Sequence, residues 1–237
     1  MKNSNVILAA LCASFVLGSA YAAEHVVLES NAVRYVAGSL LDAALPIMLE
    51  SGEFVLLTTE DARFLRIEGP HNGPAEGEAP DESALRRALE LLVAKERTQV
   101  GGVGGVRGGG EDEATEDTRT EPWLVHAERS GDQCVLRGAD VALWRERADA
   151  GAQWEIAAAG SERTAAFTFG AGERRAAWPA ALAPQDNEIY LVRPAAAQRS
   201  VAIRLHLLEP SVGANSLAAA AWLAAKGCTA QARLLLR

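Results

Sequence analysis

Residues 201–208 read VAIRLHLL, and this run indicates the fold more directly than any other part of the chain. Its apolar side chains alternate with Arg204 and His206, which is typical of a β-strand with one buried face and one solvated face. Similar runs, rich in apolar and β-branched residues, precede it. Together the predicted strands of this half are 133–137, 141–146, 153–158, 164–169, 174–178, 188–192 and 201–208.

Turn sequences such as Asp149-Ala150-Gly151 and Gly170-Ala171-Gly172 separate these strands. Short strands at this spacing, with turns between them, favour antiparallel pairing into two packed sheets. The second half therefore resembles an immunoglobulin-like β-sandwich in the number and spacing of its predicted strands. Its cysteines do not show the usual immunoglobulin spacing around a central tryptophan, so only the architecture is predicted.

After the last strand the sequence becomes helical. Asn215 or Ser216 can cap an alanine-rich helix that runs to Lys226, and Gly227 provides a left-handed stop. A second short helix is predicted from Thr229 through Leu236. Cys228 lies at the elbow between the two helices, where a disulfide would tie the helical tail to the sandwich.

A glycine-rich and acidic segment lies between the two halves. From residue 100 to residue 122 the chain reads VGGVGGVRGGG and then EDEATEDTRTEP. Ordering glycine costs backbone entropy and closely spaced carboxylates repel, so a flexible linker is predicted. The segment contains neither a G-x-G-x-x-G register nor a Gly-Lys-Ser/Thr sequence, which argues against a phosphate-binding loop. The predicted organisation is a leader over 1–23, a β-rich domain with a closing helix over 24–99, the linker over 100–122, and the sandwich with its helices over 123–237.

The first half reads as short β-strands followed by one helix. A hairpin turn is predicted at 60–62, and the stretch 71–80, HNGPAEGEAP, is expected to be irregular. Asp81 can cap a helix to about Arg97 that carries one apolar stripe, at Leu85, Ala88, Leu89 and Leu92. The predicted strands are 25–29, 34–37, 47–49, 53–59 and 63–68.

The run 45–70, LPIMLESGEFVLLTTEDARFLRIEGP, resembles the short-stranded repeat of the iron-dicitrate-sensor (FecR-like) periplasmic β-domains. The resemblance rests on glycine, alternating apolar residues and Gly69-Pro70. It implies a bacterial envelope protein that contacts other envelope components. The transmembrane helix and cytoplasmic anti-sigma segment of that family have no counterpart in the sequence, so regulation of a sigma factor is not expected.

The N-terminal stretch 1–23, MKNSNVILAALCASFVLGSAYAA, has the form of a secretory signal peptide, with cleavage expected after Ala22 or Ala23. Its apolar run is shorter than the about 20 residues of a membrane anchor, and Cys12 lies mid-run rather than at a lipoprotein position. We therefore expect a periplasmic or secreted protein with no membrane span after cleavage. Cleavage would leave Cys134 and Cys228, and an even cysteine count in an oxidising compartment predicts one disulfide.

The sequence offers no motif for catalysis, cofactors or metals. A net charge of -8 argues against nucleic-acid binding. Neither G-x-S-x-G nor H-E-x-x-H occurs, and the four histidines show no ligand spacing. His206 is expected on the solvated face of its strand. No catalytic, cofactor-binding or metal-binding residue is therefore predicted.

The remaining prediction is a non-enzymatic binding or assembly module that contacts envelope proteins. Its candidate contact surface comprises Trp144, Trp154, Trp178, Arg174 and Arg175. Tryptophan more often fills the core of a small sandwich. If these tryptophans were exposed, binding of a glycan or of peptidoglycan would be a better prediction than binding of a protein.

A hydrolase with a non-standard site is the other alternative, and it requires a pocket that holds a histidine and a carboxylate within hydrogen-bond distance. The second-half arginines, Arg145 and Arg147 included, could also meet the acidic linker or first domain.

Overall fold

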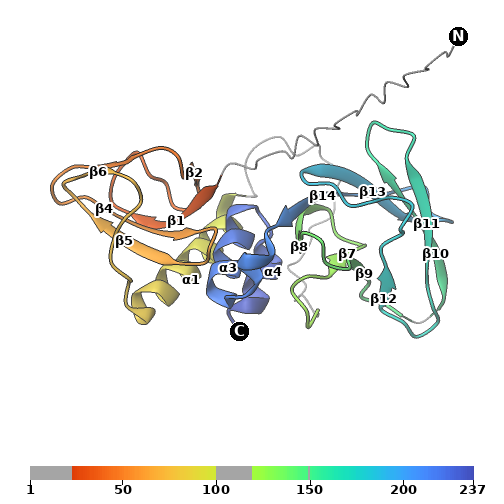
Figure 1. Cartoon of the computed structure of the whole chain (residues 1–237). Helices are drawn as coiled ribbons and strands as arrows, with labels where there is room; N and C mark the ends of the chain where they lie inside the picture. The colour runs from red at the N-terminus through yellow and green to blue at the C-terminus, as the bar shows by residue number, and fades with distance from the viewer. Residues whose placement is uncertain (1–22, 100–118, 149) are drawn as a thin grey trace, which may run out of the picture.

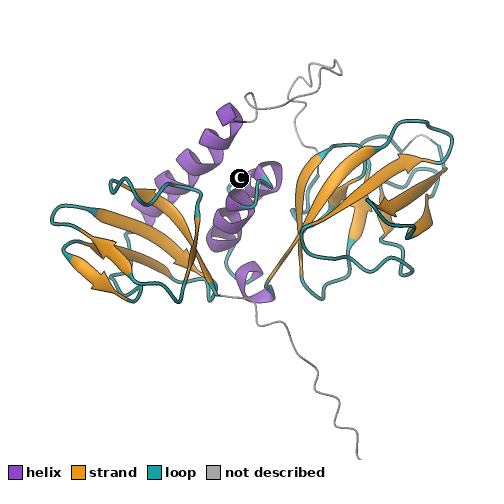
Figure 2. Ribbon diagram, turned by 90° about the horizontal axis from the view of Figure 1, so that it is seen from above, coloured by secondary structure: helices purple, strands orange, loops and turns teal. Residues whose placement is uncertain are grey.

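The computed structural model describes residues 23–99, 119–148 and 150–237. The predicted signal peptide, apart from its last residue, and most of the predicted linker lie outside these residues. The described chain is mainly β, with 37% strand and 18% helix, as the sequence predicts. Two β-modules lie at opposite ends of the molecule and helices lie between them (Figures 1 and 2). We call residues 23–99 the first module, 119–208 the sandwich and 210–235 the helical tail.

The first module is built on an antiparallel sheet with the strand order β2-β1-β4-β5, beside which β3 pairs with β6. One face buries an apolar cluster around Val27, Leu57 and Ile67. The other face presents Val26 and Leu28 to the helices. The bounds are β1 (Glu24–Ser30), β2 (Leu40–Asp42), β3 (Ile47–Leu49), β4 (Phe54–Thr59), β5 (Phe64–Glu68) and β6 (His71–Gly73).

Two predictions for this module are wrong. Residues 34–37 form a loop instead of a strand, because the chain turns back there: the Tyr35 N–H donates to the Ala32 carbonyl, and Gly38 has a positive φ of 92°. The strand of this region is β2, which begins at Leu40. Residues 71–73, expected to be irregular, form β6, because pairing with β3 supplies partners that local sequence does not reveal.

Helix α1 (Glu82–Gln99) begins as predicted. The Asp81 carboxylate accepts hydrogen bonds from the Ser83 and Ala84 N–H groups, at 2.9 and 3.1 Å, and these bonds lower its pKa. The predicted stripe of Leu85, Ala88, Leu89 and Leu92 is buried. It packs against β1 and against the helical tail.

The sandwich consists of a five-stranded sheet with the order β11-β10-β13-β14-β8 and a three-stranded sheet with the order β12-β9-β7. The larger sheet is antiparallel except where β14 runs parallel to β8. The predicted strands 164–169 and 201–208 are confirmed to the residue, whereas the two-residue β7 was not predicted. The bounds are β7 (Val125–His126), β8 (Gly131–Leu136), β9 (Ala142–Trp144), β10 (Ala152–Ala158), β11 (Thr164–Phe169), β12 (Arg175–Ala177), β13 (Glu188–Pro194) and β14 (Val201–Leu208).

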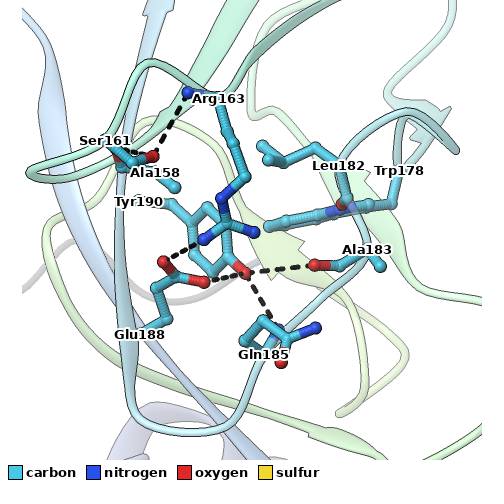
Figure 3. Close-up of polar contacts among 9 residues, drawn as sticks. All are labelled: Ala158, Ser161, Arg163, Trp178, Leu182, Ala183, Gln185, Glu188 and Tyr190. Carbon is cyan, nitrogen blue, oxygen red and sulfur yellow. Dashed lines mark hydrogen bonds and ion pairs between the residues drawn. The ribbon is translucent and has the colours of Figure 1, made fainter.

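A buried tyrosine joins β13 to the loop before it, as in the tyrosine corner of immunoglobulin-like sandwiches (Figure 3). The Tyr190 hydroxyl accepts the Gln185 N–H at 2.9 Å and lies 3.1 Å from a Glu188 carboxylate oxygen. Burial, the largest cause, raises the pKa of Tyr190 to about 12. The Trp178 ring meets the Tyr190 ring edge to face at 5.0 Å. The corner therefore anchors the strand that carries the centre of the sandwich core.

The helical tail comprises α2 (Pro210–Gly213), α3 (Ser216–Ala225) and α4 (Thr229–Leu235). The Asn215 side chain caps α3 by accepting the Leu217 and Ala218 N–H groups, and Gly227 ends it with a φ of 79°. Residues 218–224 of α3 are all buried. One hydrophobic cluster includes α3, the α1 stripe, the outer face of β1, and Cys134 and Leu208 of the sandwich. The tail is thus shared by both modules.

Cys134 of β8 and Cys228 of the α3–α4 elbow form a disulfide, which confirms the predicted pairing. A second link lies beside it. The Cys134 N–H donates to the Gln231 amide oxygen at 2.8 Å, and the Gln231 amide nitrogen donates to the Cys134 carbonyl at 2.8 Å. A side chain from α4 therefore occupies the hydrogen-bonding groups of an edge strand.

Removing the disulfide should destabilise the protein. The bridge joins residues 94 positions apart, and loop-closure entropy for that separation corresponds to at most about 4.5 kcal/mol. We expect the free energy of unfolding of the double variant Cys134→Ala/Cys228→Ala, measured by urea titration, to be lower than that of wild type by a large part of this amount. Wild-type protein kept under reducing agent serves as the control and should show a similar loss. An unchanged unfolding free energy in both samples would contradict the prediction.

Candidate functional site

The three tryptophans proposed as a contact surface are core side chains. Trp144, Trp154 and Trp178 are all buried. Trp154 packs against the rings of Phe167 and Phe169, with centroids 6.2 and 5.6 Å apart. Trp154 and Trp178 belong to the apolar cluster between the two sheets, a space that takes large apolar groups, whereas Trp144 is buried in a separate small cluster. They therefore do not form an exposed contact surface or a stacking platform for a glycan.

The proposed arginines have separate environments. Arg174 and Arg175 are exposed, and one Arg175 nitrogen lies 3.0 and 3.1 Å from the two carboxylate oxygens of Glu121, an acid of the predicted linker segment. Arg145 is buried instead, donates to the Glu173 and Gly170 carbonyls, and lies over the Phe169 ring. The structure thus pairs one second-half arginine with a linker acid, while Arg145 has a structural role.

His206 does not lie on a solvated face of β14, as the sequence predicts, but is largely buried. Its side chain is only 12% exposed, and its Nε2 lies 2.8 Å from an Asp132 carboxylate oxygen. The helical tail covers this end of the sheet, since Leu208 of β14 and Cys134 of β8 pack in the same cluster as α3. No serine, threonine or cysteine of the described chain hydrogen-bonds to the His206 ring. The pair therefore links β14 to β8.

A cavity of about 250 Å³ lies beside this pair and beside the disulfide elbow. Asp132, Ser130, Thr229 and a second histidine, His126, line it, but His206 does not. The Nδ1 atom of His126 accepts the Glu128 N–H at 3.1 Å. The described residues also contain no group of three or more histidine, cysteine, aspartate or glutamate side chains that could hold a metal ion.

A second cavity, of about 200 Å³, lies where the first module meets the sandwich and the tail. Charged side chains from all three parts converge there. Lys226, which follows α3, pairs with Glu24 of β1 at 3.3 Å, and Arg137 after β8 pairs with Glu209 after β14 at 2.9 Å. Glu60, in the β4–β5 turn, completes the junction, and its carbonyl accepts the hydroxyl of a tail serine at 3.0 Å.

Glu60 has the most perturbed carboxylate of this junction. Burial, the largest cause, raises its pKa, and the negative charges of Glu24 and Glu209 raise it further. A backbone hydrogen bond and Lys226 act in the opposite direction. The charges at this junction therefore hold the modules against each other while leaving one carboxylate in an unfavourable field.

The first module exposes four large apolar side chains on its loops and on β3. Their exposed fractions are 96% for Val33, 56% for Val36, 61% for Leu45 and 46% for Met48. The β1–β2 loop and β3 are held together because the Met48 N–H donates to the Tyr35 hydroxyl at 2.8 Å. We call these four residues the apolar loop surface. Sequence reasoning missed it, since it placed residues 34–37 in a strand; the neighbouring Asn31 and Gly38 were the available turn signals.

Comparisons with known proteins add no relative. No family model, no curated protein and no solved structure matches the chain. None of the described helices combines the length and apolar character needed to cross a bilayer.

Neutralising Glu60 should make the junction more stable at neutral pH. A raised pKa in the folded state means that the folded protein binds this proton more tightly than the unfolded protein does. Above the raised pKa, the ionised Glu60 carboxylate therefore destabilises the fold. Below the pKa of the unfolded state, the carboxyl is protonated in both states and this cost is absent. We expect Glu60→Gln to raise the thermal midpoint at pH 7 by no more than about 2 °C. This gain should vanish as the pH falls through the acidic range.

Thermal unfolding of wild type and Glu60→Gln at several pH values measures this effect. Glu162→Gln is the control, because Glu162 is an exposed acid outside the junction. A gain for Glu60→Gln that did not change with pH, or an equal gain for the control, would show that the junction charges are not responsible.

Proposed function

We propose that this protein is an exported, non-enzymatic binding or assembly module that acts through protein contacts in the cell envelope. The observation that carries the proposal is the apolar loop surface of Val33, Val36, Leu45 and Met48. Exposed apolar side chains on the loops of a rigid scaffold are typical of contact sites for other proteins. Their burial by a partner would remove apolar area from water, which is the main driving force of association.

The scaffold beneath this surface supports the same proposal. Tyr35 is partly buried against the module's core, and its hydroxyl fixes the backbone of β3. The Asn31 side chain accepts the Phe54 N–H at 2.7 Å and donates to the Gly52 carbonyl at 3.0 Å. The loops are therefore held in place before any partner arrives, which lowers the entropy cost of binding.

The location in the envelope rests on two further observations. The disulfide between Cys134 and Cys228 suits an oxidising compartment, and the leader at 1–23 has the form of an export signal. Leu45 and Met48 also fall within the stretch 45–70 that resembles FecR-like periplasmic β-domains. A contact with another envelope protein fits all three.

The experiment is affinity capture from envelope extracts with the mature protein and with the variant Val33→Asp/Leu45→Asp. Charges on the apolar loop surface oppose burial by a partner, so we expect recovery of the bound protein to fall at least about tenfold. Leu91→Asp is the matched control, because Leu91 is a 62% exposed leucine on α1. It should capture the partner as wild type does.

Thermal unfolding of the three proteins shows whether each variant keeps the native fold, and both should, since all three positions are exposed. Equal recovery of the partner by Val33→Asp/Leu45→Asp and by wild type would overturn the apolar loop surface as the contact site.

A further inference from the structure

The larger sheet of the sandwich has two edges, and only one of them is covered. At the β8 edge, the Gln231 side chain bonds to both the N–H and the carbonyl of Cys134. At the other edge, β11 pairs with β10 and, within the described residues, with no further strand. β11 lies at the end of the molecule farthest from the first module (Figure 1). Among the described residues, its outer side therefore has no strand partner.

Hydrogen bonds on both sides of β10 show which groups of β11 point outward. The Ala158 N–H donates to the Arg163 carbonyl, and these residues continue the β10–β11 register, in which Ala157 lies opposite Thr164. Antiparallel pairs alternate between bonded and non-bonded positions, so Ala165, Phe167 and Phe169 bond to β10. On the far side of β10, the Ala159 N–H donates to Ile189 and the Ala195 N–H to Gln153, which fits the same alternation. The N–H and carbonyl groups of Thr164, Ala166 and Thr168 thus face away from the sheet.

This edge lacks the features that usually keep sheet edges from pairing. Edge strands are commonly short, charged, bulged or interrupted by proline. β11 has six residues, reads TAAFTF, and pairs with β10 in an unbroken register. The neighbouring edge strand β12 is three residues long and carries the exposed Arg175. In the first module, the β5 edge is bridged at Arg66 by Glu78.

We propose that β11 pairs antiparallel with β11 of a second copy of this chain, about a twofold axis at Ala166. In this register, Thr164 of one copy lies opposite Thr168 of the other, and Ala166 lies opposite Ala166. All three outward-facing residues then form bonded pairs. The inference is independent of the apolar loop surface, which lies on the other module.

The side chains favour a second copy over an unrelated strand. The exposed Thr164, Ala166 and Thr168 fall on one face, so the two copies bring threonine against threonine, a favourable cross-strand pair. On the buried face, Ala165 of one copy meets Phe167 of the other and the apolar inner layer continues across the axis. A one-residue slip would place buried side chains on the solvated face. The strand also carries no charge that would repel its own copy.

The test is sedimentation velocity of the mature full-length chain over a dilution series. We expect wild type to form a dimer of twice the monomer mass at the high end of the series. In Thr164→Lys/Thr168→Lys, the introduced lysines of the two copies lie opposite each other, so the dimer should be lost. In Thr164→Lys/Thr168→Glu, each lysine faces a glutamate of the other copy, so the dimer should return.

The two double variants differ little within one chain, since positions 164 and 168 lie about 13 Å apart along an extended strand. Ile189→Lys is a further control, because Ile189 is exposed on β13, two strands in from the β11 edge, and lies outside the hollow that Thr164 and Ala166 line. It should leave the dimer intact. The proposed pairing would be overturned by a monomeric wild type at every concentration, by a dimer that persists in Thr164→Lys/Thr168→Lys, by loss of the dimer in both double variants, or by its loss in Ile189→Lys.

Discussion

Burial of α3 on all sides is the constraint on which the arrangement of this protein depends. Its residues 218–224 are six small or aliphatic side chains and one tryptophan, all buried. The alanines allow close approach from both sides, so β1 and α1 pack on one part of the helix while β8 and β14 meet the cluster from the other. Without the helix, two apolar faces would be exposed to water. The helical tail therefore forms an apolar core that both modules share.

The links around the tail fix its position. The disulfide attaches the α3–α4 elbow to β8, and Gln231 occupies the edge of the same strand. His206 and Asp132 join β14 to β8 beside this elbow, and the ion pairs of Lys226 and Arg137 surround the junction with the first module. These polar side chains, which include types common in catalytic sites, therefore act as structural links between the tail and the two modules. Buried polar groups need hydrogen-bond partners, and tertiary packing supplies them.

The two contact sites that we propose lie on different modules and use different physics. The apolar loop surface offers hydrophobic area on loops that hydrogen bonds hold in place, whereas β11 offers backbone groups that pair with no further strand of the described chain. A chain with one site of each kind can join a second copy at one end and hold a partner at the other. Such an arrangement suits an assembly role in the envelope better than it suits a single enclosed binding pocket.

Strand and helix positions with strong local patterns followed from the sequence: β11 and β14 to the residue, the α1 stripe, the Asn215 cap and the single cysteine pair. Local signals sufficed there because side-chain period, capping chemistry and an even thiol count are properties of short segments or of composition. The short strands β2, β6 and β7, the loop at 34–37, the burial of Trp144, Trp154 and Trp178, and the covered face of His206 became visible only in the folded chain. An alternating pattern shows that a strand has two unlike faces, but which element covers each face depends on contacts between residues far apart in the sequence.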